Sequence, residues 1–170
     1  MGQVKGKFFK MAGSLMMKHE LDKANDYLKG MTGATHLDLE DDGWYETSIF
    51  DSFLNIPAQM SVNKDYTYVI VGKRVYPTIK KTVGLPAELK TPLDFLKYEA
   101  QGFLMNHKGD DVVPRKFIKV DNKEVIVQAK SPGYNNRLFE GVFLGILEMC
   151  GINSGKVERQ PNDVFKITWR

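Results

Sequence analysis

The chain has 170 residues, a formal net charge of +3 and one cysteine. This length is typical of a single domain, which can bury roughly 70% of its unfolded surface without disulfides or metals. The mild charge argues against a dedicated nucleic-acid binder, in which basic side chains cluster on one face.

The first half of the chain, residues 1–86, has the pattern of a helical unit. Apolar side chains at helical spacing predict one helix over residues 8–19 and a second that begins near Leu21 and ends at Gly30. The acidic stretch 31–43 is expected to be an exposed loop. It lacks the alternating ligands and closing glutamate that a calcium-binding loop requires.

Two more helices are predicted in this half. Residues 44–60 open with aromatic side chains and continue at helical spacing, and Pro57 is expected to end or bend this helix. Residues 66–80 are harder to assign, because their β-branched and aromatic side chains favour a strand. Apolar and small side chains nevertheless recur at helical spacing, so we expect a helix here, followed by a linker around Pro86.

The second half, residues 87–170, alternates helices with pairs of strands. Thr91 is a favourable N-cap with proline after it, and Gly109 is expected to end the helix that starts there. Residues 116–120 and 124–129 are predicted to form two strands joined by a hairpin turn.

A second helix and a last hairpin complete this half. Asn135 or Asn136 is expected to cap the helix, and Gly151 to end it. Residues 156–160 and 164–169 are predicted to pair around a turn of proline, asparagine and aspartate.

Together these elements predict a single α+β domain over residues 1–170. Its N-terminal helical half (1–86) would pack on a four-stranded antiparallel sheet that carries two further helices (87–170). The basic side chains of the first hairpin, among them Arg115 and Lys119, are expected to lie on a solvated face.

Two features leave alternatives open. Gly141 and Gly145 lie four residues apart on the last helix. Small residues at this spacing either let another backbone approach closely or leave room for a ligand beneath the helix. The many aromatic and methionine side chains likewise fit either an ordinary core or an adaptable apolar cavity.

The sequence has no Gly-x-Ser-x-Gly elbow, phosphate-binding glycine loop or His-Glu-x-x-His motif. Its three histidines, at 19, 36 and 107, are far apart, and Cys150 ends an apolar helix face as a buried, inert thiol would. We therefore expect neither enzymatic activity nor a bound cofactor. The lone cysteine fits a reducing, cytoplasmic compartment, and no apolar run approaches the ~20 residues of a membrane span.

Several short segments match one known family in their order along the chain. They are Gly2-Gln3-Val4-Lys5-Gly6, Gly43-Trp44-Tyr45, Pro92-Leu93-Asp94-Phe95-Leu96, the helix 138–151 with its small residues, and the last strand, 164–169. In these segments the chain resembles the haem nitric-oxide/oxygen-binding (H-NOX) superfamily, which also includes 4-vinyl-reductase-type domains and a subunit type of the vesicle-tethering TRAPP complex. The resemblance covers most of the chain and implies an α+β fold of this kind.

Two departures concern the residues with which haem-binding members hold haem. Where those members have the proximal histidine, the spacing places Phe103, which offers iron no ligand. Where they have Tyr-x-Ser-x-Arg for the propionates, the chain reads Val127-Gln128-Ala129-Lys130-Ser131, and Tyr134 and Arg137 come four residues too late. His107 follows Phe103 by one helical turn, so a shifted register leaves haem ligation by His107 open.

The resemblance and its departures imply a non-enzymatic sensory or regulatory domain that binds a small apolar ligand independently of haem. The residues expected to line the ligand cavity are Phe103, Leu104, Phe143 and Leu147, with Trp44 and Tyr76 farther out. One alternative is a protein–protein interaction module that dimerises with its cavity filled, and another is a haem gas sensor that uses His107. We expect a protein partner or a homodimer, and no nucleic-acid or membrane partner.

Overall fold

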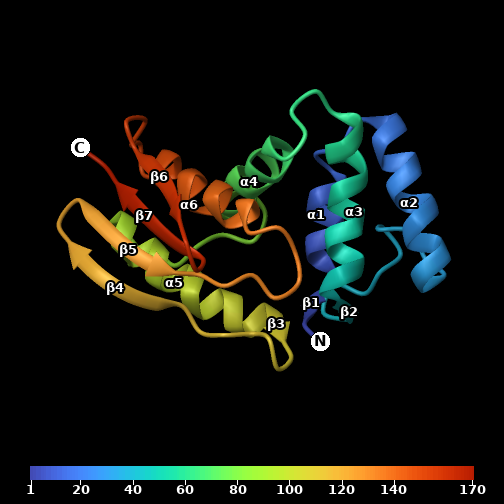
Figure 1. The fold of residues 1–170 in the computed structure, drawn as a ribbon, viewed down its shortest axis with the longest axis horizontal. Helices are drawn as coiled ribbons and strands as arrows, with labels where there is room; N and C mark the ends of the chain where they lie inside the picture. The colour runs from blue at the N-terminus through green and yellow to red at the C-terminus, as the bar shows by residue number, and fades with distance from the viewer.

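The computed structural model describes all residues, 1–170. The helices are α1 (Lys7–Gly13), α2 (Lys18–Thr32), α3 (Thr47–Met60), α4 (Tyr66–Thr82), α5 (Pro92–Asn106) and α6 (Arg137–Met149). The strands are β1 (Gln3–Lys5), β2 (Trp44–Glu46), β3 (His107–Lys108), β4 (Lys116–Asp121), β5 (Glu124–Gln128), β6 (Lys156–Gln160) and β7 (Val164–Thr168). Helices α1, α2 and α3 form one lobe and the large sheet belongs to the other, with α4 between them (Figure 1).

The predicted α+β class and the four-stranded antiparallel sheet are confirmed. The sheet has the order β4-β5-β7-β6, and all of its neighbouring strands run antiparallel. Alternate side chains of its two central strands are buried, because one face of the sheet packs on helices. Phe143 of α6 contacts Phe165 of β7, with the ring centroids 5.4 Å apart.

The sequence does not predict a second, smaller sheet of order β2-β1-β3. In this sheet Val4 of β1 lies opposite Tyr45 on one side and His107 on the other. Strands of two or three residues are too short to show the alternation of side chains from which strands are predicted. The small sheet joins the start of the chain to the end of α5, so it connects the two halves.

This sheet corrects two predicted boundaries. The helix predicted over 44–60 begins only at Thr47, because the aromatic residues before it form β2. The helix after Thr91 ends at Asn106 and not at Gly109, because His107 leaves the helix to pair with β1. The N-cap prediction is confirmed, since the Thr91 hydroxyl accepts a hydrogen bond from the Asp94 backbone N–H at 3.2 Å.

The first two helices also differ from their predictions. The apolar pattern of 8–19 is divided between α1, which ends at Gly13, and α2, which begins at Lys18. The break coincides with a local cap, in which the Glu20 carboxylate accepts the backbone N–H of Met17 at 3.1 Å. Helix α2 continues past Gly30 and ends before Gly33, whose φ of +78° is the left-handed conformation that glycine readily adopts.

Pro57 neither ends α3 nor stops its packing. The helix runs through this residue to Met60, and Pro57 is buried with its neighbours. Proline lacks the N–H that would bond to the carbonyl four residues earlier, so it costs α3 one hydrogen bond, and the burial of Pro57 offsets part of that loss. Of the two predicted effects, an end of the helix at Pro57 is therefore wrong, and a bend stays a prediction.

The helix expected over 66–80 is confirmed as α4, and it crosses α6 at very close range. A Cβ added at Gly72 would collide with the Leu138 carbonyl oxygen, and one at Gly141 with the Val69 carbonyl oxygen. A Cβ at Gly145 would collide with the Lys73 carbonyl oxygen. Of the two interpretations of the small residues on α6, close backbone packing is the one that the structure supports.

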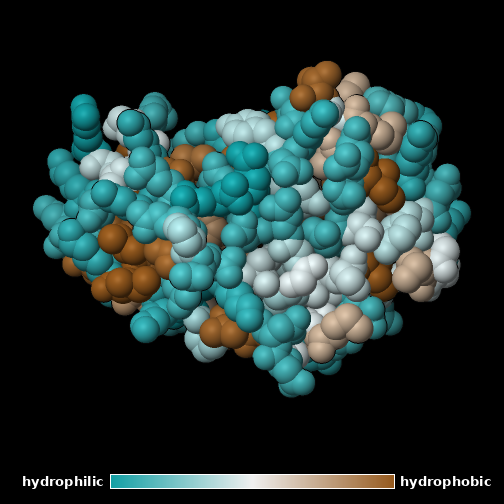
Figure 2. Space-filling model, viewed as in Figure 1, coloured by the Kyte–Doolittle hydropathy of each residue, from teal (hydrophilic) through white to brown (hydrophobic).

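The face of the molecule drawn in Figure 2 is largely polar, with separate apolar patches. None of the helices combines the length and apolar composition that crossing a bilayer requires.

Candidate ligand-binding site

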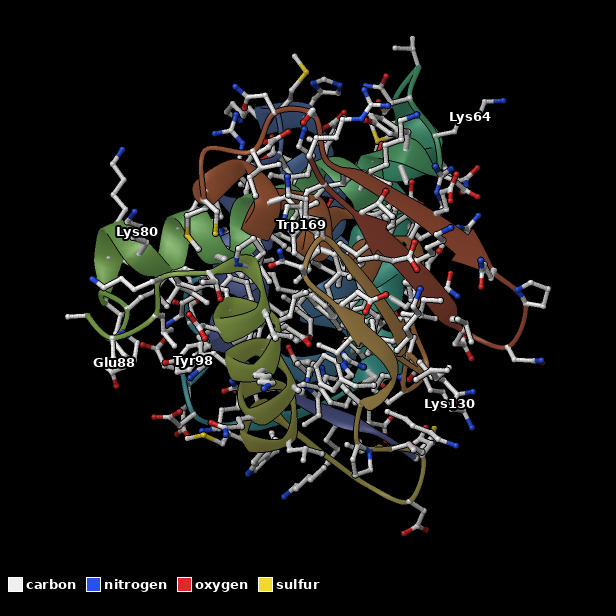
Figure 3. All side chains as sticks on the ribbon, turned by 90° about the vertical axis from the view of Figure 1, so that its left-hand side faces the viewer. Lys64, Lys80, Glu88, Tyr98, Lys130 and Trp169 are labelled. Atoms are coloured by element: carbon white, nitrogen blue, oxygen red, sulfur yellow. The ribbon has the colours of Figure 1, made fainter.

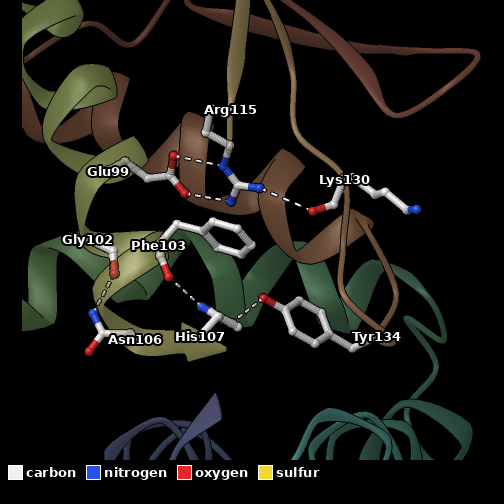
Figure 4. A network of polar contacts seen from close by, with 8 residues as sticks. All are labelled: Glu99, Gly102, Phe103, Asn106, His107, Arg115, Lys130 and Tyr134. Atoms are coloured by element: carbon white, nitrogen blue, oxygen red, sulfur yellow. Dashed lines mark hydrogen bonds and ion pairs between the residues drawn. The ribbon is translucent and has the colours of Figure 1, made fainter. Parts of the chain in front are cut away.

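Four polar side chains are buried where the C-terminal part of α5 meets the helical half. They are Glu99, His107, Arg115 and Tyr134. Figure 4 shows them as two hydrogen-bonded groups beside Phe103, one of Glu99 with Arg115 and the other of His107 with Tyr134. A buried charge or hydroxyl is costly unless it is paired, so the partners of each group decide what this site can do.

Arg115 and Glu99 form a buried ion pair. The guanidinium donates from Nη2 to Glu99 Oε1 at 2.8 Å and from Nε to Oε2 at 3.3 Å, which is a bidentate arrangement. A third hydrogen bond runs from Nη1 to the Lys130 carbonyl oxygen at 3.3 Å. The guanidinium carbon lies 3.7 Å from the ring centroid of Phe103 and 4.1 Å from that of Phe139.

The expectation that Arg115 lies on a solvated basic face is therefore wrong. Arg115 comes directly before β4, where the chain turns toward α5, and its side chain points into the protein. The carboxylate of Glu99 and the two aromatic faces compensate the guanidinium for the loss of water. Lys119, by contrast, is half exposed and pairs with Asp121 and Glu124, as a residue on a solvated face should.

His107 is held on both sides of its ring. Nδ1 lies 2.9 Å from the Phe103 carbonyl oxygen, and Nε2 lies 2.8 Å from the Tyr134 hydroxyl. Since a carbonyl can only accept, Nδ1 carries the hydrogen and Nε2 accepts from the hydroxyl. Burial lowers the pKa of His107 to about 4 and raises that of Tyr134, so both groups are neutral at pH 7.

The cavity that this network borders is small. It has a volume of about 70 Å³ and is lined mainly by apolar side chains of α4, α5 and α6, together with Val4 and Phe8. Binding sites for small organic ligands usually measure roughly 300–1,000 Å³. The cavity alone can hold water-sized molecules but no drug-sized ligand.

Only two of the six expected ligand-lining residues border this cavity. Phe103 and Tyr76 line it. Phe143 is buried against the large sheet instead, and Leu147 packs beside Gly155. The prediction for Leu104 is corrected, because this side chain is 44% exposed on the outer face of α5.

Trp44 lies apart from the cavity, in the small sheet. The ammonium groups of Lys5 and Lys108 lie 5.6 Å and 4.6 Å from its ring centroid, so two cations flank the indole. The structure thus places Trp44 at the surface seam between the halves and not in the interior.

The sequence prediction missed Glu99, Arg115 and Tyr134. For Glu99 a signal existed, because it lies three residues after Leu96 and four before Phe103, on the apolar face of the predicted helix. A carboxylate on such a face needs a buried cation. No comparable signal marks Arg115 or Tyr134, whose partners are distant in sequence.

No protein-family model and no curated protein sequence matches the chain. Solved structures do. The Fe(II) unliganded H-NOX protein from K. algicida superimposes with a TM-score of 0.73 at 17% identity, over 98% of this chain and 96% of that one. A mutant of T. Tengcongensis H-NOX gives a TM-score of 0.62 at 13% identity, over 97% and 94% of the two chains. The chain has the H-NOX fold.

The H-NOX fold implies haem, which makes specific demands on the residues around it. An axial ligand must offer iron a free atom, yet Nε2 of His107 is hydrogen-bonded to Tyr134. A porphyrin also needs a wide slot, yet the cavity measures about 70 Å³, and the Arg115 guanidinium packs against the rings of Phe103 and Phe139, which line it. No group of three or more His, Cys, Asp or Glu side chains is placed to hold a metal ion. This arrangement does not fit haem.

Proposed function

We propose that the chain is a non-enzymatic sensory domain that uses the H-NOX fold to bind a small, mainly apolar ligand independently of haem. The observation that carries this proposal is the buried Arg115–Glu99 pair, whose guanidinium packs against the rings of both Phe103 and Phe139. A porphyrin placed against these rings would have to displace the buried ion pair. A smaller molecule beside it would not have to displace the pair.

Acid–base catalysis is a poor alternative for the same network. A general base works best when its pKa lies near the working pH. Burial instead lowers the pKa of His107 to about 4 and raises that of Tyr134, so that neither group exchanges protons readily at pH 7. The two residues are better suited to holding structure than to moving protons.

A sensory role is supported by the way in which this site joins the two halves. His107 borders the cavity and pairs with Val4, which belongs to the first strand of the chain. Asp51 of α3 accepts the backbone N–H of Asn135, before α6, at 2.9 Å. A ligand that prefers one spacing of these elements would shift the population of that arrangement, which is how a binding event becomes a signal.

Haem binding is the first test of the proposal. Purified protein titrated with hemin should give no saturable one-to-one complex and no Soret band that depends on His107. A one-to-one Soret band that is lost in His107→Ala would contradict the proposal.

Native mass spectrometry of protein purified from its own host is the second test. We expect a retained small molecule with a mass well below that of haem. The same spectrum gives the number of subunits, and therefore tests the homodimer. A spectrum dominated by a haem-bound species would again contradict the proposal.

A further inference from the structure

A second hollow adjoins the buried cavity and opens to the surface between α1, the end of α4 and α5. Its volume is about 360 Å³, which lies within the range of small-molecule sites. Apolar side chains form much of its wall, among them Phe8, Met11, Ile79 and Met105. Figure 3 shows α5, with Tyr98, beside the end of α4, where Lys80 is labelled. We call this hollow the side cleft.

The side cleft and the buried cavity meet at Tyr76, which lines both. Tyr76 is only 6% exposed, and burial raises the pKa of its phenol, so the hydroxyl stays neutral. Buried hydroxyl groups almost always have a hydrogen-bond partner. The hydroxyl of Tyr68 lies 3.4 Å from carboxylate and amide oxygens of α3, and that of Tyr134 bonds to His107. The Tyr76 hydroxyl makes no side-chain hydrogen bond to the protein, and its oxygen is not among the fully enclosed unpartnered atoms, so a molecule in the cleft can reach it.

Open space lies directly beside this hydroxyl. A Cβ added at Gly102 of α5 would meet a single atom within 4 Å, the Tyr76 hydroxyl oxygen at 3.5 Å. That distance is an ordinary van der Waals contact. Gly102 lines both the cavity and the side cleft, so the space at this glycine joins the two.

The charged groups around the side cleft already have partners. At its outer end, the ammonium groups of Lys5 and Lys7 lie 2.9 Å and 3.8 Å from the carboxylate of Asp42. In the buried cavity that adjoins the cleft, Glu99 pairs with Arg115. A charged ligand group would lose water here without gaining an unpaired opposite charge.

We propose that the side cleft binds a neutral, mainly apolar small molecule that carries one hydrogen-bonding oxygen. The oxygen bonds to the Tyr76 hydroxyl, and the apolar part lies against α1, α4 and α5 and fills the space at Gly102. This inference rests on the proposed function and adds to it the chemical class of the ligand, its route of entry and the residue that recognises its polar group.

The test uses octan-2-one as the probe, followed by the amide resonances of ¹⁵N-labelled protein. We expect saturable shifts at Gly102 and Gly84, which both line the cleft. Octane lacks the oxygen, and octanoate adds a charge. Each should bind at least about tenfold more weakly, as expected for the loss of one hydrogen bond or the burial of an unpaired charge.

Two variants locate the site. Tyr76→Phe should weaken octan-2-one about tenfold while leaving octane unchanged, because only the hydroxyl is removed. Gly102→Leu should abolish binding of both probes by filling the space. Gly30→Leu is the matched control, since Gly30 lies in α2 with no atom within 4 Å of its added Cβ and should bind as the wild type does.

Several results would overturn the inference: no saturable binding, binding that Gly102→Leu leaves intact, an unchanged affinity in Tyr76→Phe, or tighter binding of octanoate. These results leave the proposed function standing if native mass spectrometry still finds a retained small molecule. Hemin binding through His107 would instead contradict the proposed function itself, so the two failures are distinguishable.

Discussion

The two faces of α4 differ in how they are filled. Toward α6, glycines on both helices bring the backbones into direct contact, and no side chain can be added at Gly72, Gly141 or Gly145 without a collision. Toward α1 and α5, the same helix borders a cavity, a cleft and the unpartnered hydroxyl of Tyr76. Glycine therefore has a different role at each face. Gly141 of α6 lets the two backbones make contact, whereas Gly102 of α5 leaves space beside α4.

We call the face of α4 toward α6 the closed face and the face toward α1 and α5 the open face. Substitutions at the closed face should have the largest effect on stability. Gly141→Leu places a side chain against the carbonyl of Val69 and the Cα of Gly72, so α4 and α6 must separate. We expect the free energy of unfolding in urea to fall by more than about 4 kcal/mol. Gly102→Leu makes the same substitution on the open face and should stay within about 1.5 kcal/mol of the wild type. Equal losses in the two variants would contradict the distinction between the faces.

Breaking the buried ion pair beside the open face should have the second-largest effect on stability. Glu99→Ala leaves the Arg115 guanidinium buried without its carboxylate, and we expect a loss of about 3–5 kcal/mol in urea denaturation. The double variant Glu99→Leu/Arg115→Met replaces both charges with apolar groups and should recover most of that loss. If the double variant is as unstable as Glu99→Ala, the loss does not come from an unpaired buried charge, and the prediction is wrong.

Much of this fold can be predicted from local signals. The two hairpins of the large sheet and the cap at Thr91 follow from periodicity, turn residues and capping residues, which act over a few positions of the chain. For α4, helical spacing competes with a propensity for strand, and the family resemblance also favours the helix. The small sheet does not, because β1 and β3 are held in place by each other and are separated by about a hundred residues. Their stability comes from tertiary contact, which a local pattern does not record.

The candidate site was less predictable than the fold. The spacing correctly placed Phe103 on an apolar helix face, and Glu99 on the same face indicates a buried carboxylate. Nothing local identifies Arg115 as its partner, because an arginine at the start of a basic hairpin has the pattern of a solvated residue. The open space at Gly102 is equally hidden, since glycine carries no information about what lies beside it.

The hydrogen-bonded imidazole at the open face predicts a pH dependence. Burial lowers the pKa of His107 from 6.5 to about 4 in the folded protein. Between pH 6.5 and pH 4 the imidazole is therefore protonated in the unfolded chain and neutral in the folded protein. The free energy of unfolding should therefore fall by up to roughly 3 kcal/mol as the pH drops from about 6.5 to 4.

A variant separates this contribution from that of other groups. His107→Gln has no titrating ring, so the fall in its free energy of unfolding over the same pH range should be smaller by that amount. Burial also lowers the pKa of His36, which remains in both proteins and cancels in the difference. Identical pH profiles for the two proteins would mean that His107 is not held neutral by its surroundings.

The smallest expected effect is a gain in stability. Gly102→Ala adds one methyl group beside the Tyr76 hydroxyl without touching any backbone, and it removes a flexible residue from the interior of α5. Alanine should therefore raise the free energy of unfolding by about 0.5–1 kcal/mol, seen as a melting temperature about 2–3 °C higher. The same methyl group takes space from the side cleft, so affinity for octan-2-one should fall as stability rises. A structural glycine would not behave this way, because replacing it lowers stability, as at Gly141. A gain in stability joined to a loss of binding would show that Gly102 keeps space open for a ligand at the expense of a more stable helix.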